Sequence, residues 1–145
     1  MPDVNSLDRF VEAQTLNYKT ALAEIRRGAK RSHWMWYVFP QFTGLGRSST
    51  AQHFAVRSLE EARAYLDHAV LGPRYLECVA ALQDLATSNA EAVFGDIDAT
   101  KLRSSLTLFE AVRPNALIAA ALDRWFGGKR DPMTLRLIGD AAPAG

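Results

Sequence analysis

Residues 7–28 read LDRFVEAQTLNYKTALAEIRRG, and the spacing of apolar residues in this stretch decides the fold class. Residues of one helical face recur at intervals of three and four: Phe10, Gln14, Tyr18, Leu22 and Ile25. Gly28 is a natural stop for this helix, and Thr15 or Asn17 could divide it in two. The stretch therefore predicts an amphipathic helix, or a pair of helices, at the start of the chain.

Gln14 is the one polar member of that stripe. A buried amide must find hydrogen-bond partners or cost about 1–3 kcal/mol. Two explanations are open at this point. Gln14 is either a core residue that ties down a loop or a residue that faces a ligand.

The same helical spacing recurs along the rest of the chain. Apolar residues three and four apart follow the Ser58-Leu59-Glu60-Glu61 capping box, the Gly72-Pro73 pair and Asp98, and no segment alternates with a period of two. We therefore predict an all-α fold: one compact domain over 1–145, with six to eight short helices around one core. This is not a simple four-helix bundle. The ends, 1–6 and 139–145, are expected to fray.

Composition narrows the protein class. The 145 residues are 48% apolar and 23% charged, which is ordinary for one globular domain. The single cysteine, Cys78, permits no intramolecular disulfide, and no stretch resembles a signal peptide or a membrane span. We expect a cytoplasmic protein that needs no membrane, and a monomer or a weak homo-oligomer.

Charge is unevenly distributed although the net charge is only +1. Residues 19–57 carry seven basic side chains and one acid, Glu24, and the basic residues of this segment are Lys19, Arg26, Arg27, Lys30, Arg31, Arg47 and Arg57. Such a segment is either a solvated basic face or the contact for a local anionic partner.

Aromatic side chains crowd into the same segment, KRSHWMWYVFPQFTGLGRSS at residues 30–49. Its core, 33–39, is a short strand or a short buried helix, because periodicity cannot decide at this length. If the segment is extended, Trp34 and Trp36 share a side, and their rings could stack on a nucleobase. His33 beside them is either structural or a general base. The bland alternative is that these aromatics only fill the core.

Two further groups could bind an anion. The loop from Gly44 through Gly46 and Arg47 to Ser48 precedes a predicted helix, so its backbone N–H groups could cradle a phosphate, or it is a plain surface turn. Lys101, Ser104 and Ser105 lie within about one turn of a later helix and could do the same, or form a solvated first turn. No histidine, cysteine or acid has metal-ligand spacing, so neither metal nor cofactor is predicted.

Taken together, many of these residues resemble one known family, the domain-of-unknown-function 1810 family of bacterial proteins. The resemblance covers residues 7–138 and rests on Asp8-Arg9-Phe10-Val11, Ala13-Gln14, His33-Trp34-Met35-Trp36, Phe39-Pro40-Gln41, Gly44, Gly46, Lys101-Leu102 and Ser104-Ser105. It implies a compact helical domain and no established activity.

A second, local likeness involves about twenty residues. Phe10, Ala13-Gln14 and 24–27 are similar to the start of the NADAR family, whose helical members cleave N-glycosidic bonds in riboflavin intermediates or ADP-ribosylated bases. No acidic residue here matches the catalytic residues of that family.

The leading functional hypothesis is a pocket for a small anionic ligand, a phosphorylated or nucleotide-like metabolite. Its candidate residues are Gln14, Lys30, His33, Trp34, Trp36, Gln41, Gly44, Gly46, Arg47, Ser48, Lys101, Ser104 and Ser105. An enzyme built on this pocket would be a hydrolase of a nucleotide-like or ribose-containing substrate, including a NADAR-like N-glycosidase. The alternative is an interaction module whose basic segment docks an acidic protein or nucleic acid. We rank this alternative second, because the sequence contains no nucleic-acid-binding motif.

Overall fold

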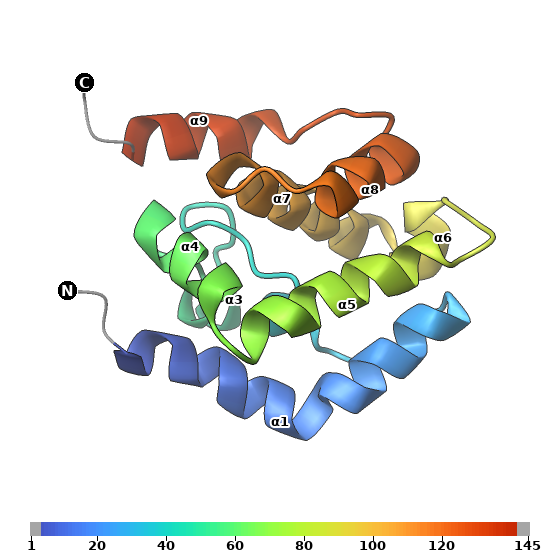
Figure 1. Ribbon diagram of the computed structural model, residues 1–145, viewed down its shortest axis with the longest axis horizontal. Helices are drawn as coiled ribbons and strands as arrows, with labels where there is room; N and C mark the ends of the chain where they lie inside the picture. The colour runs from blue at the N-terminus through green and yellow to red at the C-terminus, as the bar shows by residue number, and fades with distance from the viewer. Residues whose placement is uncertain (1–3, 142–145) are drawn as a thin grey trace.

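The computed structural model of the chain describes residues 4–141, which form nine α-helices and no strand. In chain order they are α1 (Val4–Arg27), α2 (Met35–Val38), α3 (Ser49–His53), α4 (Leu59–Asp67), α5 (Leu71–Gln83), α6 (Ala90–Phe94), α7 (Asp96–Val112), α8 (Ala116–Phe126) and α9 (Pro132–Ala141) (Figure 1). The predicted all-α single domain is confirmed. The total exceeds six to eight because α2, α3 and α6 are helices of four or five residues. Of the predicted frayed ends, 4–6 belong to α1 and 139–141 to α9, and the remainder lies outside the described residues.

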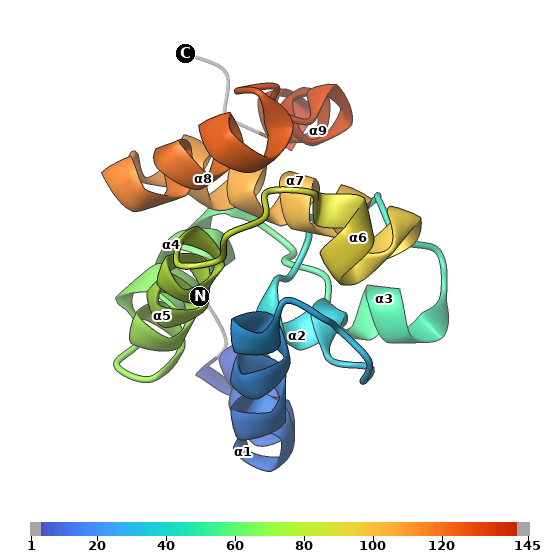
Figure 2. The same ribbon diagram turned by 90° about the vertical axis from the view of Figure 1, so that its right-hand side faces the viewer.

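Helix α7 is the centre of the molecule. It contacts α2, α4, α6, α8 and α9, and Figure 2 shows it with α8 above and α6 beside it. The sequence explains this position, because α7 buries side chains on more than one face, among them Leu102, Leu106, Leu108 and Phe109. A helix that is apolar over much of its circumference must be surrounded by others. The arrangement is therefore a helix wrapped by its neighbours, in agreement with the prediction that it is not a four-helix bundle.

Helix α1 is a single helix, so of the two alternatives the undivided helix is observed and the chain does not break at Thr15 or Asn17. Both side chains are exposed and bond back to the preceding turn, Thr15 Oγ1 to the carbonyl of Val11 (2.7 Å) and Asn17 Nδ2 to that of Ala13 (3.4 Å). Such bonds satisfy the polar side chain without ending the helix, although they often bend it. Figure 1 shows that α1 indeed bends near its middle.

The segment between α1 and α4 is a long excursion with little regular structure. Within 33–39, residues Met35–Val38 form α2, so of the two alternatives for this segment the short helix is observed and the strand is not. An isolated parallel bridge between Phe42 and Val56 closes the excursion, and Ser48 caps α3 as predicted by accepting a bond from the Ala51 N–H (3.1 Å). The bridge and the cap fix the loop against the core without a sheet.

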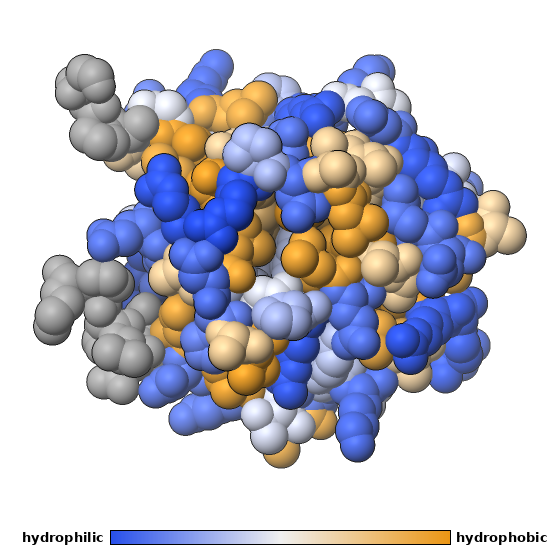
Figure 3. Space-filling model, viewed as in Figure 1, coloured by the Kyte–Doolittle hydropathy of each residue, from blue (hydrophilic) through white to orange (hydrophobic). Residues whose placement is uncertain are grey.

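The surface is mixed in character. On the face drawn in Figure 3, apolar patches are separated by hydrophilic side chains. Among residues 4–141, none of the helices is both long enough and apolar enough to traverse a bilayer.

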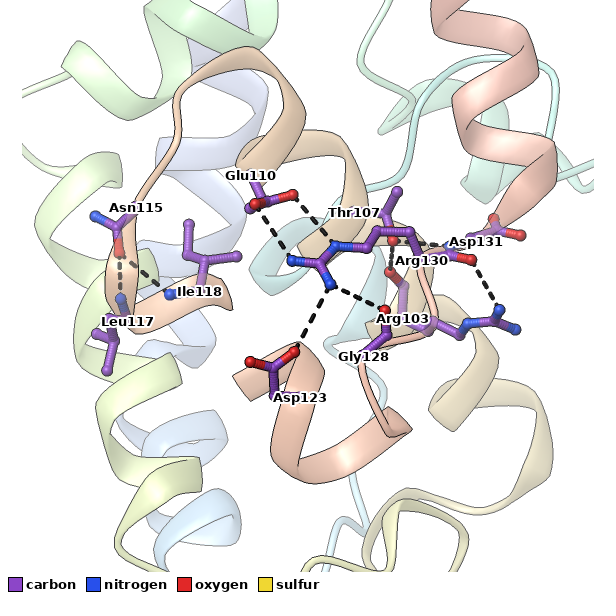
Figure 4. A network of polar contacts seen from close by, with 10 residues as sticks. All are labelled: Arg103, Thr107, Glu110, Asn115, Leu117, Ile118, Asp123, Gly128, Arg130 and Asp131. Atoms are coloured by element: carbon purple, nitrogen blue, oxygen red, sulfur yellow. Dashed lines mark hydrogen bonds and ion pairs between the residues drawn. The ribbon is translucent and has the colours of Figure 1, made fainter. Parts of the chain in front are cut away.

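A polar network fastens the loop between α8 and α9 to α7 (Figure 4). Arg130 pairs with Glu110 (3.3 Å) and Asp123 (3.7 Å), and the Asp131 N–H donates to Thr107 Oγ1 (3.0 Å). The Asp131 carboxylate accepts a bond from Ser104 (2.8 Å). Burial alone would raise the pKa of Asp131, but hydrogen bonds from Thr134 and Ser104 outweigh it and lower the pKa. This loop is therefore held by charge and hydrogen bonds rather than by apolar packing.

Candidate functional site

A hollow of about 620 Å³ opens where the 30–36 segment meets α6 and the first turn of α7. Figure 2 shows the elements that supply its walls, with α2 below α6. Its walls are formed by Lys30, His33, Met35, Trp36, Phe94, Gly95, Asp96, Ile97 and Asp98. Three predicted site residues, Lys30, His33 and Trp36, line this hollow.

Trp36 is the aromatic wall of the hollow, and a fourth predicted residue adjoins it. Lys101 on α7 places its ammonium 4.7 Å from the centre of the Trp36 ring. The centre of the His33 ring lies 6.5 Å from that of the Trp36 ring, with the two planes 27° apart. Trp36 is half-buried and His33 is exposed, so both rings reach solvent. Residues distant in the chain thus surround one indole.

The charges in the hollow are largely matched. Asp98 lies between two lysines, 2.7 Å from the Lys30 ammonium and 3.6 Å from that of Lys101. Lys30 also donates to the Ser32 carbonyl (2.6 Å), and its side chain is only 9% exposed. Lys30 therefore anchors the segment to α7, whereas Lys101, with the longer contact, is the cation that a ligand can engage more easily.

Glu24 on α1 holds in place, through hydrogen bonds, the segment that carries Lys30, His33 and Trp36. Its carboxylate is buried and accepts bonds from the N–H groups of Arg31 (2.8 Å) and Ser32 (2.9 Å) and from the Trp34 indole (2.9 Å). Burial would raise the pKa of Glu24, but these bonds and one from the Ser32 hydroxyl outweigh it and lower the pKa to about 2. Glu24 is a positioning residue that charge counting missed, because it is the lone acid in a basic segment.

Trp34 is separated from Trp36 by the helical turn of α2. Its side chain is fully buried, with its ring against Phe39 and Phe94. The expectation that the two tryptophans share a side is therefore wrong, since they lie in different environments. Only Trp36 lines the hollow.

Gln14, Ser104 and Ser105 are also buried away from the hollow. The Gln14 amide donates to the Tyr37 carbonyl (2.7 Å) and the Tyr65 hydroxyl (3.0 Å), which ties α2 and α4 to α1. Ser105 pairs with the Tyr75 hydroxyl (2.9 Å), and Ser104 belongs to the network that holds Asp131. These three residues serve the core, so Lys101 is the one member of its predicted cluster that lies beside the hollow.

The glycine loop lies elsewhere. Gly44 has a φ of +100°, and a Cβ there would come within 3.3 Å of Leu137 on α9. Gly46, the exposed Arg47 and Ser48 lead into α3, and Gln41 takes part in the backbone bridge to Val56. None of these five residues lines the hollow at Trp36. The sequence placed them close to Trp36 in the chain, but the excursion carries them to a different part of the molecule.

Asp96, Asp98 and Phe94 complete the hollow and were not predicted as site residues. They lie where α6 ends and α7 begins, and the only sequence signal was that of a helix boundary. Within 4–141, no three histidine, cysteine, aspartate or glutamate side chains gather so as to hold a metal ion. Cys78 is buried on α5, and burial raises the pKa of its thiol to about 12. A thiolate nucleophile is therefore not available at neutral pH.

Comparison with known proteins agrees with this architecture. The chain matches the model of the family described as protein of unknown function (DUF1810) over residues 4–138. It is also similar to the crystal structure of the conserved hypothetical protein Rv1873 from Mycobacterium tuberculosis. The identity is 43% and the TM-score 0.91, over 94% of this chain and 99% of the other. None of the curated proteins matches it. The chain belongs to the DUF1810 family.

Proposed function

We propose that this protein binds a small nucleotide-like metabolite in the hollow beside Trp36. The observation that carries the proposal is a hollow of about 620 Å³ lined by Lys30, His33 and Trp36. Lys101, which lies 65 residues beyond Trp36 in the chain, contacts the Trp36 ring beside it. Ligand sites for small molecules occupy about 300–1,000 Å³ and combine apolar walls with a few polar groups. The volume and the mixed walls both suit a nucleotide.

The residues in and beside the hollow could each contact a different part of a nucleotide. Met35, Trp36 and Phe94 offer an apolar and aromatic surface to a base. Lys101 is the cation that meets a phosphate or carboxylate, because its contact with Asp98 is the looser of the two. Asp96 is exposed, and a carboxylate of this kind accepts bonds from ribose hydroxyls.

The test is thermal-shift and calorimetric screening with nucleotides, ADP-ribose and sugar phosphates. A ligand that binds the native state raises the melting temperature. Lys101→Ala and Trp36→Ala should each weaken binding by about tenfold or more, since each removes a cation or a stacking face. Lys19→Ala, an exposed lysine on α1, is the matched control and should bind normally. Equal affinity in all three variants would overturn the proposal.

Hydrolysis of a ribose-linked N-glycosidic bond is the reaction that the hollow's carboxylates favour. Such reactions pass through a transition state with positive charge on the sugar, which a nearby carboxylate stabilises. Asp96 carries no ion pair within the described part of the chain, so its charge is available for this role. Release of free base from a bound nucleoside, lost in Asp96→Asn with ligand affinity retained, would support the activity. Binding without release would leave a binding protein.

Docking through the basic segment is the competing proposal. Arg26 and Arg27 in the last turn of α1 and Arg31 just beyond are exposed, whereas Lys30 is committed to Asp98. An acidic partner on this face would bind with an affinity that falls steeply with salt. Salt-insensitive binding of a small ligand, unaffected by Arg27→Ala, would favour the hollow instead.

A further inference from the structure

A second hollow, of about 340 Å³, lies between α6, α7 and the end of α8. Its walls include two acids, Glu91 and Asp96, one arginine, Arg103, and two aromatic residues, Trp125 and Phe126. We infer that this hollow binds a small zwitterion of the size of a dipeptide, with its carboxylate at Arg103 and its ammonium at the two acids. The two hollows share Asp96 at their rims, but this inference rests on Arg103 and Glu91, which line only the second hollow.

Arg103 is prepared to receive a carboxylate. Its Nε donates to the Lys129 carbonyl (2.7 Å). One Nη donates to the Arg130 carbonyl (2.8 Å; Figure 4), so the guanidinium is fixed against the α8–α9 loop. The other Nη has no protein partner, and the arginine has no ion pair, among residues 4–141. A guanidinium already fixed in place loses little freedom on binding an anion. The lysines beside Trp36, by contrast, already face Asp98.

The two acids of this hollow attract a positive charge. Glu91 and Asp96 are exposed and form no ion pair in the described part of the chain. Two carboxylates at the rim repel a dianion such as a phosphate and attract an ammonium group. The ligand that satisfies both walls is therefore a monocarboxylate that also carries a cation.

The spacing of the two charges sets the length of the ligand. Asp96 and Arg103 are seven residues apart on α7, which places them on one face about 10 Å apart along the helix axis. A single α-amino acid carries its ammonium and carboxylate on one carbon and cannot reach both walls. A dipeptide separates these groups by an additional residue. Its second side chain would lie against Phe126, which is half-buried.

The probe is the dipeptide alanyl-phenylalanine, titrated into the full chain by calorimetry. The free dipeptide should bind saturably. Acetylating its amine or amidating its carboxyl should each weaken binding by about tenfold or more, because each removes one charge-assisted contact. Free phenylalanine should bind more weakly than the dipeptide. Equal binding of the capped peptides, or no binding of the dipeptide, would overturn the inference.

Two variants locate the site. Arg103→Gln should lose most of the affinity for the dipeptide, and Glu91→Gln should lose part of it. If Arg103→Gln fails to fold, the comparison of capped and free peptides on the unaltered chain still decides the question. Lys101→Ala should bind the dipeptide normally, because Lys101 faces Trp36 on the other side of α7. Loss of dipeptide binding in Lys101→Ala would assign the ligand to the hollow beside Trp36 and refute the second site.

Discussion

At the scale of single residues, Glu24 shows how a buried charge can serve a surface site. The carboxylate is almost completely buried, yet its oxygens accept three N–H bonds and one hydroxyl bond. A buried charge is tolerated only when its hydrogen-bonding capacity is used in this way. The bonded groups belong to 31–34, so Glu24 determines where Lys30 and His33 are presented.

Glu24 should make the protein sensitive to acid. Because its pKa in the folded protein is about 2, below the ordinary 4.5, its stabilisation is complete above pH 4.5 and is lost as the pH falls toward 2. The pKa difference corresponds to about 3 kcal/mol. Glu24→Gln should be less stable at pH 7, by about 2–3 kcal/mol, and should lose less of its stability than the native chain between pH 5 and 2.

Urea denaturation at a series of pH values measures this effect. Glu12→Gln, on the exposed side of the same helix, is the matched control and should keep the pH dependence of the native chain. If Glu24→Gln and the native chain lose stability in parallel as the pH falls, the charge of Glu24 does not hold the segment.

At the scale of elements, the local spacing of apolar residues predicted the long helices. The conformation of the short segments depends on the residues that pack around them. The stripe from Phe10 to Ile25 is a helix because one continuous face meets the core. The pattern of 33–39 allowed either helix or strand, and Met35–Val38 within it form a short helix. No neighbouring strand is present in 4–141 to pair with them.

The junction between α4 and α5 depends on a glycine. A Cβ at Gly72 would lie 2.1 Å from the Leu66 carbonyl oxygen, a backbone atom that cannot move aside without shifting α4. Gly72→Ala should therefore lower the free energy of unfolding by about 2–3 kcal/mol.

Gly139 on α9 provides the contrasting substitution. It has open space around it, so Gly139→Ala should be neutral or raise stability by up to about 1 kcal/mol. Thermal unfolding followed by circular dichroism compares the two variants. A Gly72→Ala protein as stable as Gly139→Ala would show that the two helices are not packed as closely as described.

At the scale of the whole molecule, one core joins the helices around α7. Phe109 of α7 is fully buried and its ring lies 5.2 Å from that of Tyr65 on α4 and 4.7 Å from that of Tyr75 on α5. A shared core of this kind unfolds as one unit in a domain of this size. Local loss of one helix should therefore be coupled to loss of the others.

Phe109→Ala should cost about 3–5 kcal/mol, with circular dichroism and tryptophan fluorescence giving the same transition midpoint. Leu16→Ala is the control, since Leu16 is 83% exposed and its truncation should change stability little. Separate midpoints for the two probes would mean that the helices belong to more than one cooperative unit.

The sequence by itself determined the helical class, the principal helices and the presence of one core, because apolar spacing is a local property that each segment carries. It also named Trp36 and three residues that lie around it, Lys30, His33 and Lys101. Only the tertiary structure decided that Trp34 and Gln14 serve the core, that the glycine loop lies against α9, and that Asp98 and Arg103 face hollows. Those assignments depend on which distant segments pack together, and a local pattern does not specify the partner that a side chain will meet.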